Sequence, residues 1–139
     1  MSFGSEESVI RTLNISVRAV MRQAVTVSPS EAVSSILSSM VVKDIGAVIV
    51  VEKDKPVGMI TEKDVLERVL MAKKDMYSTQ AKDFMSKPVI SIEADRSIKE
   101  AFELMQKHHI RRLAATENGT LIGVVTERRL LREFMNQLA

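Results

Sequence analysis

The sequence contains no cysteine, and it has no long apolar run. The first absence excludes disulfides, thiolate nucleophiles and cysteine-ligated zinc, and it fits a reducing compartment. The longest strongly apolar run, Ile45 to Val51, is too short to cross a bilayer. The first seven residues lack the basic region and apolar core of a secretory signal. We therefore expect a soluble, cytoplasmic protein.

The chain also lacks a strong excess of positive or negative residues. The 20 basic and 18 acidic residues are interspersed and leave a net charge of only +2, so no molecule-wide field attracts nucleic acid or membrane. Aromatic residues make up 4% of the chain, which provides few platforms for base stacking. The chain also lacks a P-loop, a Gly-x-Ser-x-Gly motif and a metal-ligand cluster. We expect neither an enzyme nor a cofactor or metal site.

An internal repeat is the strongest positive feature. Gly58-Met59-Ile60-Thr61-Glu62-Lys63-Asp64 recurs as Gly123-Val124-Val125-Thr126-Glu127-Arg128-Arg129, an offset of 65 residues. Towards the start of each copy the offset is 64, which pairs Met21 with Met85. A repeat of this length is a supersecondary unit that is not expected to bury its apolar face alone.

The first copy alternates between strand and helix patterns. After a turn at residues 16–21 we predict a strand at 25–27, a helix capped by Ser28 with Glu31 closing a capping box, and a buried strand at 47–51. A turn at 52–55, a strand at 56–61 and a helix from Glu62 to about Leu70 follow. Residues 1–13 lie outside the repeat, as a frayed leader or a short packing helix.

The second copy repeats this order. It predicts a strand at 89–92, a helix capped by Asp95, strands at 113–116 and 121–125, and a last helix from Glu127 to about Gln137. Asn118-Gly119 between those strands is a strong hairpin signal. Each copy is thus strand, helix, strand, strand, helix, an α/β (α+β) fold.

This doubled order, with its Gly-apolar-x-Thr-x-x-Asp element, resembles the CBS domain in tandem, a Bateman module, over about residues 15–137. The resemblance implies a leader at 1–14 and CBS units at 15–76 and 77–139 that pack about a pseudo-twofold axis. It also implies clefts for adenine-containing ligands and a regulatory role. We expect a protein made of this pair alone, acting on a partner in trans.

In the family, the Thr and Asp of this element contact phosphate or ribose, which assigns those roles to Thr61 and Asp64. An ionised carboxylate offers paired acceptors to a diol, and a helix start favours phosphate. The alternative is that Thr61 simply caps the helix and Asp64 completes a capping box. In the second copy Thr126 is kept, but Arg129 replaces the Asp and has no acceptor for a diol.

The resemblance implies that Arg111 and Arg112 bind the phosphates of the nucleotide held by Asp64. A solvated charge pair is the alternative. The apolar end of this cleft is expected from Ile60, Met85, Val89 and Ile90, which could equally be plain core. The other cleft, expected from Ile45, Ala47, Thr126 and Arg129, is degenerate or differently used.

The expected function is adenine-nucleotide sensing, with AMP, ADP or ATP as the ligand. S-adenosylmethionine fits less well, because it has no phosphate for the two arginines. One alternative is a homodimerisation module that pairs apolar helix faces, such as those of Val65, Leu66, Val69 and Phe134. Another is nucleic-acid binding through a local arginine patch. We expect dimerisation and ligand sensing to coexist.

Overall fold

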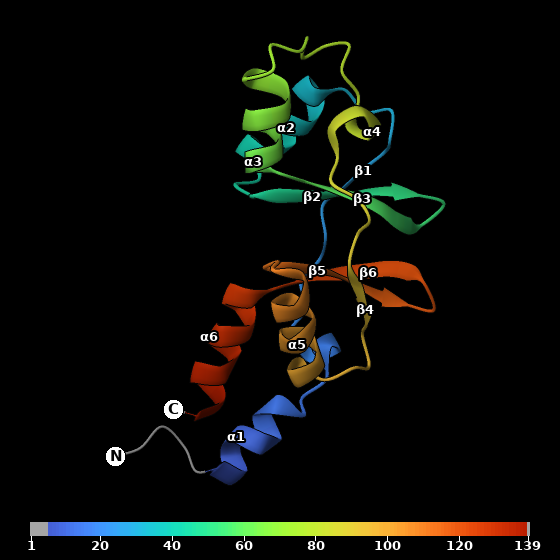
Figure 1. The fold of residues 1–139 in the computed structure, drawn as a ribbon. Coiled ribbons are helices and arrows are strands. Elements are labelled where there is room, and N and C mark those ends of the chain that lie inside the picture. Colours follow the sequence, from blue (N-terminus) through green and yellow to red (C-terminus); the bar gives the residue numbers. More distant parts are fainter. Residues whose placement is uncertain (1–5, 139) are drawn as a thin grey trace. The chain divides into compact units, whose positions relative to one another are not determined.

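The structure is a computed structural model that describes residues 6–138 (Figure 1). Contacts divide the chain into two compact units. The central unit comprises Ala24–Val89, and the terminal unit comprises Met1–Gln23 together with Ile90–Ala139. The start of the first repeat therefore belongs to the terminal unit, whereas the sequence similarity alone suggests boundaries at 14 and 76.

The predicted element order is confirmed in both units. The central unit contains β1 (Thr26–Val27), α2 (Val33–Val42), β2 (Ala47–Glu52), β3 (Lys55–Thr61), α3 (Glu62–Val65), the π-helical η2 (Leu66–Leu70) and α4 (Ala81–Phe84). The terminal unit contains α1 (Glu6–Leu13), the 3-10 helix η1 (Val17–Ala19), β4 (Ser91–Glu93), α5 (Ile98–His108), β5 (Arg112–Glu117), β6 (Thr120–Thr126) and α6 (Glu127–Leu138).

Each unit has its own three-stranded sheet, with the order β1-β2-β3 or β4-β5-β6. The first two strands of each sheet are parallel and the last two form an antiparallel hairpin. The second hairpin turns at Asn118 and Gly119, both with positive φ, as the Asn-Gly pair predicts. In the first hairpin, Lys53 and Asp54 take the same left-handed conformation without a glycine.

Alternate strand residues face the helices and form one core per unit. In the central unit the core includes Val48, Val50 and Ile60, and in the terminal unit it includes Leu113, Ala115 and Val125. The residues between them, such as Thr61 and Thr126, lie on the other face of their sheet because strand side chains alternate. The helix α1 packs on α5 and α6, so residues 6–13 are a packing helix and not a frayed leader.

The last strand of each sheet is bordered by a short segment from the other repeat. Ser86 forms an antiparallel bridge with Met59 of β3, and Arg22 forms the equivalent bridge with Val124 of β6. A glycine allows each close approach. A Cβ at Gly123 would lie 2.8 Å from the carbonyl oxygen of Arg22, and a Cβ at Gly58 would lie 2.7 Å from Cγ of Met85.

Two predicted helix starts are wrong. The helix predicted to begin after Ser28 begins at Val33, because the carbonyls of Pro29 and Glu31 accept hydrogen bonds from the start of α4. The helix expected to be capped by Asp95 is capped by Ser97, whose hydroxyl accepts from the N–H of Glu100 at 3.2 Å.

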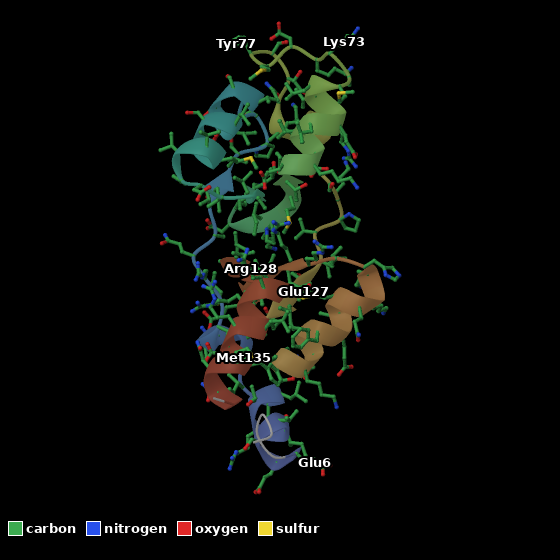
Figure 2. All side chains as sticks on the ribbon, turned by 90° about the vertical axis from the view of Figure 1, so that its left-hand side faces the viewer. Glu6, Lys73, Tyr77, Glu127, Arg128 and Met135 are labelled. Atoms are coloured by element: carbon green, nitrogen blue, oxygen red, sulfur yellow. The ribbon has the colours of Figure 1, made fainter. Side chains whose placement is uncertain are left out.

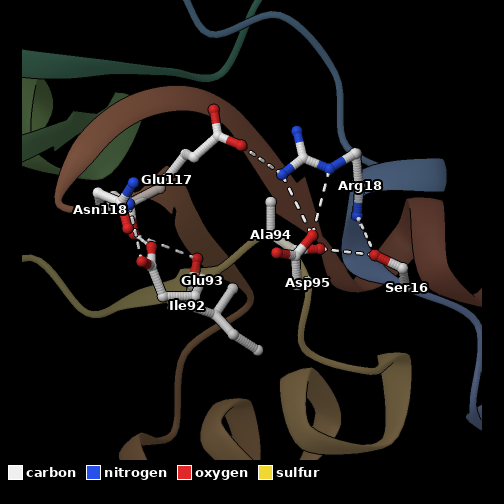
Figure 3. A network of polar contacts seen from close by, with 9 residues as sticks. Ser16, Arg18, Ile92, Glu93, Ala94, Asp95, Glu117 and Asn118 are labelled. Atoms are coloured by element: carbon white, nitrogen blue, oxygen red, sulfur yellow. Dashed lines mark hydrogen bonds and ion pairs between the residues drawn. The ribbon is translucent and has the colours of Figure 1, made fainter.

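Asp95 instead belongs to a polar network that ties η1 to the terminal sheet (Figure 3). Arg18 contacts Glu117 at 2.8 Å and Asp95 at 3.2 Å, and the Ser16 hydroxyl donates to the carbonyl of Ala94 at 2.7 Å. The hydrogen bonds to Glu117 and Asp95 raise the pKa of the Arg18 guanidinium. This network anchors the segment that leads to Arg22.

Candidate functional site

Asp64 lies at the start of α3, where strand β3 turns into a helix. Thr61 is the N-cap, with its hydroxyl 3.4 Å from the N–H of Asp64, and the Asp64 carboxylate in turn accepts the N–H of Thr61 at 2.9 Å. The predicted capping box is therefore confirmed. Asp64 is only 8% exposed, which is unusual for an acidic residue.

The carboxylate of Asp64 has further partners that hold it in one orientation. Oδ2 also accepts a hydrogen bond from the Thr61 hydroxyl at 3.2 Å, and Oδ1 accepts one from the Ser86 hydroxyl at 3.0 Å. Arg68 Nε lies 3.7 Å from Oδ1, and its guanidinium also donates to the carbonyls of Phe84 and Met85. Neither Ser86 nor Arg68 was identified from the sequence. Ser86 reaches Asp64 only through a tertiary contact, whereas the i, i+4 spacing of Asp64 and Arg68 is a local signal that could have identified Arg68.

These contacts leave acceptor capacity on one oxygen. A carboxylate oxygen offers about two lone-pair sites. On Oδ2 both are occupied by Thr61, whereas Oδ1 accepts one hydrogen bond from Ser86 and has only the longer ion pair with Arg68. A hydroxyl donor can therefore bind Oδ1 directly, and a second can bind if the Thr61 or Ser86 hydroxyl rotates away.

The apolar residues predicted around Asp64 differ in their accessibility. Met85 is half-buried and packs beside Gly58, and Val89 is also half-buried. Ile60 is fully buried in the core of the central unit, which favours the plain-core alternative for that residue. Ile45 and Ala47, predicted for the other cleft, are half-buried in the same unit.

The terminal unit repeats this helix start without the carboxylate. The Thr126 hydroxyl accepts from the N–H of Arg129 at 3.1 Å, so Thr126 caps α6 as Thr61 caps α3. Arg129 takes the position of Asp64, and its Nε is buried and has no hydrogen-bond partner. Arginine has only hydrogen-bond donors, which is why we predict no ribose acceptor at this position.

Arg111 and Arg112, the predicted phosphate ligands, have different surroundings within the terminal unit. Arg111 is exposed and lines a pocket of about 400 Å³ with Phe102, Gln106, His109 and Glu127, among others. Arg112 is half-buried and pairs with Thr126 across the hairpin, which places the two side chains on the same face of the sheet. Ile90 is half-buried against the terminal core.

The predicted nucleotide-binding residues thus lie in both units. Within the central unit Thr61, Asp64 and Met85 come together with the unpredicted Ser86, and within the terminal unit Arg112 comes together with Thr126. Across residues 6–138, no cluster of three or more His, Asp or Glu side chains could hold a metal ion. In that same part of the chain, no helix combines the length and apolar character needed to cross a membrane.

Comparison with known proteins identifies both repeats. Residues 17–71 and 81–136 each match the family model described as CBS domain. The chain is 42% identical over 113 residues to an uncharacterized protein of Methanopyrus kandleri, covering 80% of this chain and 58% of that protein. It is 33% identical over 103 residues to the CBS domain-containing protein YhcV of Bacillus subtilis, covering 74% of this chain and 73% of YhcV.

Solved structures share the fold. A CBS domain protein from Pyrobaculum aerophilum, solved in complex with AMP, superposes with a TM-score of 0.76 over 88% of this chain and 99% of that one, at 21% identity. The structure of Hypoxic Response Protein I with two coordinated zinc ions superposes with a TM-score of 0.77 over 85% of this chain and 98% of that one, at 28% identity.

Proposed function

Because the chain belongs to the CBS domain family and carries two copies of the domain, we propose that it is a regulatory protein that binds an adenine nucleotide. The observation that carries the proposal is the Asp64 carboxylate, which is held in place by Thr61 and Ser86 and retains acceptor capacity on Oδ1. It binds the hydroxyls of the ribose. The protein regulates a partner in trans and has no catalytic activity of its own.

The ribose assignment follows from the chemistry of the carboxylate. A diol needs two adjacent acceptors, and an oriented carboxylate supplies them. The hydrogen-bond donors to the Asp64 carboxylate are hydroxyls that can rotate, apart from the N–H of Thr61, and Arg68 lies at the longer distance of 3.7 Å from Oδ1. The adenine then lies against apolar side chains near Asp64, for which half-buried Met85 and Val89 are available in the central unit.

The phosphate part of the proposal concerns Arg111 and Arg112 and rests on the resemblance to the family. Arginine offers paired N–H donors to phosphate oxygens, so AMP, ADP or ATP is preferred over S-adenosylmethionine. A protein of this fold was solved with AMP, which makes AMP the first ligand to test.

The test is a thermal-shift and calorimetry panel with AMP, ADP, ATP, S-adenosylmethionine and a short RNA. A ligand at about a hundred times its dissociation constant stabilises the native state by about 2.7 kcal/mol, which moves the midpoint by several degrees. Asp64→Ala is expected to abolish the nucleotide response. Asp83→Ala is the matched control, because Asp83 accepts the N-cap N–H of α4 at 2.9 Å, as Asp64 does for α3.

The outcomes separate the parts of the proposal. Loss of binding in Asp64→Ala but not in Asp83→Ala supports the ribose assignment. Arg111→Ala and Arg112→Ala are expected to weaken ATP binding, while Lys107→Ala, an exposed cation at the end of α5, leaves it unchanged. A response to RNA that falls steeply with salt, without any nucleotide response, would favour nucleic-acid binding instead.

Exposed apolar side chains favour homodimerisation as a second function. Val41, Val42 and Met71 of the central unit are 72%, 80% and 78% exposed. Of the residues first expected in a dimer, Leu66 is exposed, but Val65 and Val69 are core residues and Phe134 packs against Phe102. Light scattering is expected to show a dimer that Val42→Lys dissociates. A wild-type monomer at high concentration would refute this part.

A further inference from the structure

Two arginines replace the central unit's Asp64 and Ser86 pair in the terminal unit. Arg129 takes the position of Asp64 at the start of the last helix. Arg22 takes the position of Ser86, because its bridge to Val124 has the geometry of the Ser86 bridge to Met59. The Ser86 bridge brings its hydroxyl 3.0 Å from Asp64. Arg22, which is exposed, begins from the corresponding backbone position, beside the strand that leads to Arg129.

The backbone N–H of Thr126 lacks the carboxylate acceptor that its equivalent in the central unit has. The N–H of Val124 donates to the carbonyl of Arg22 at 2.8 Å, along the outer edge of β6. The N–H two residues later, on Thr126, points to the same edge. In the central unit the equivalent N–H of Thr61 is satisfied by Asp64 Oδ2 at 2.9 Å, whereas Arg129 has no acceptor to offer.

The positive charge gathered around Thr126 has no acidic partner. Arg22, Arg112 and Arg129 make no ion pair with any described residue, and the Nε of Arg129 is buried without a hydrogen bond. Arg112 adds to the charge because it lies opposite Thr126 on the same sheet face. The Thr126 hydroxyl accepts from the N–H of Arg129, and its own proton is free to be donated.

We propose that Arg22, Arg129 and Thr126 form a binding site for a phosphate group, which takes the place that the Asp64 carboxylate occupies in the central unit. Phosphate is the fitting anion because two arginines, a threonine hydroxyl and a backbone N–H belong to neighbouring backbone positions of different elements, and its several oxygens can accept from all of them. The site needs neither Asp64 nor a ribose. It can therefore be tested separately from the proposed nucleotide site, with which it has none of its three residues in common, although Arg112 adds positive charge here.

The experiment follows the arginine Nε–Hε signals of the full chain by NMR during titration with inorganic phosphate at constant ionic strength, with chloride as the control. The Arg129 signal is expected to shift with phosphate only. Arg129→Gln and Arg22→Ser are each expected to weaken phosphate binding at least tenfold. Arg128→Ala is the matched control, because Arg128 is exposed on the same first turn of α6 and is expected to leave binding unchanged (Figure 2).

Two further arms complete the test. Asp64→Ala is expected to bind phosphate like the wild type. Competition by AMP and ribose 5-phosphate shows whether the site also accepts a phosphate group that is attached to a ribose. Should Arg129→Gln fail to fold, the double variant Arg22→Ser, Arg129→Asp restores the residue pair of the central unit and is expected to bind no phosphate. An Arg129 signal that does not move, or an equal loss in Arg128→Ala, would overturn the proposal.

Discussion

The hydroxyl of Ser86 donates a 3.0 Å hydrogen bond to Asp64 Oδ1, and the terminal unit holds Arg22 and Arg129 at the two equivalent positions. The backbone is the same in both places, with a bridged strand edge followed by a threonine-capped helix. The chemistry is opposite, because one position offers an acceptor to hydroxyl donors and the other offers donors to an anion. A single repeated scaffold thus carries an acidic residue at one of these positions and a basic residue at the other.

Ser86→Ala is expected to leave nucleotide affinity unchanged or to raise it a few-fold. The substitution frees a lone pair on Asp64 Oδ1 for a ribose hydroxyl, at a cost to stability of about 1 kcal/mol for the lost hydrogen bond. Calorimetry with AMP and urea unfolding measure the two effects. Asp64→Asn is the contrasting variant and is expected to bind at least tenfold more weakly. A tenfold loss in Ser86→Ala would instead make Ser86 itself a ligand.

Gly123→Ala is expected to destabilise the protein by about 1 to 3 kcal/mol, and Gly58→Ala by less. The new methyl at 123 would meet the backbone oxygen of Arg22, which cannot move without breaking its bridge to Val124. At 58 it would meet the flexible side chain of Met85, which can rotate away. Urea unfolding of both variants gives the comparison. Equal costs would mean that the bridge yields as easily as the methionine side chain.

Most of the fold could be predicted from the sequence because both copies of the repeat show the same order of strand and helix patterns. The Asn118-Gly119 turn and the Thr61 capping box depend on neighbouring residues only, and both are confirmed. The prediction of a helix start at Ser28 was wrong because it depends on distant residues. The carbonyl groups of Pro29 and Glu31 accept hydrogen bonds from α4, some 50 residues later in the chain, and no local pattern reveals that competition.

The candidate site was only partly predictable for the same reason. Thr61 and Asp64 belong to one short motif, so their mutual contacts follow from helix geometry. Ser86 reaches Asp64 through a strand bridge, and Ile60 is excluded from the surface by its position on the core face of β3. Both facts depend on how segments far apart in the sequence pack together.

Ser97→Ala is expected to cost about 1 kcal/mol of stability, because the Ser97 hydroxyl caps α5. Asp95→Ala is expected to cost less, within about 0.5 kcal/mol, since its contact with Arg18 is an exposed ion pair. Urea unfolding at low and high salt separates the two, because only the ion pair is screened. A larger cost for Asp95→Ala would restore the original cap assignment.

Acid stability is expected to depend on Asp75, which closes the loop after η2. Its carboxylate accepts hydrogen bonds from the N–H groups of Tyr77 at 2.7 Å and Ser78 at 3.0 Å, and these bonds lower the pKa of Asp75. A carboxyl whose pKa is lower in the folded state stabilises the fold above its unfolded pKa of about 3.9, and that contribution is lost as the pH falls through the folded pKa.

Asp75→Asn removes this titration and is therefore expected to flatten the pH dependence of stability below about pH 4. Thermal midpoints from pH 6 down to pH 3 measure the slope for the wild type and the variant. Asp54→Asn is the control, because Asp54 is an exposed loop aspartate for which the structure shows no side-chain hydrogen bond or ion pair within residues 6–138. Parallel slopes for all three proteins would show that the Asp75 turn is equally populated in the unfolded chain.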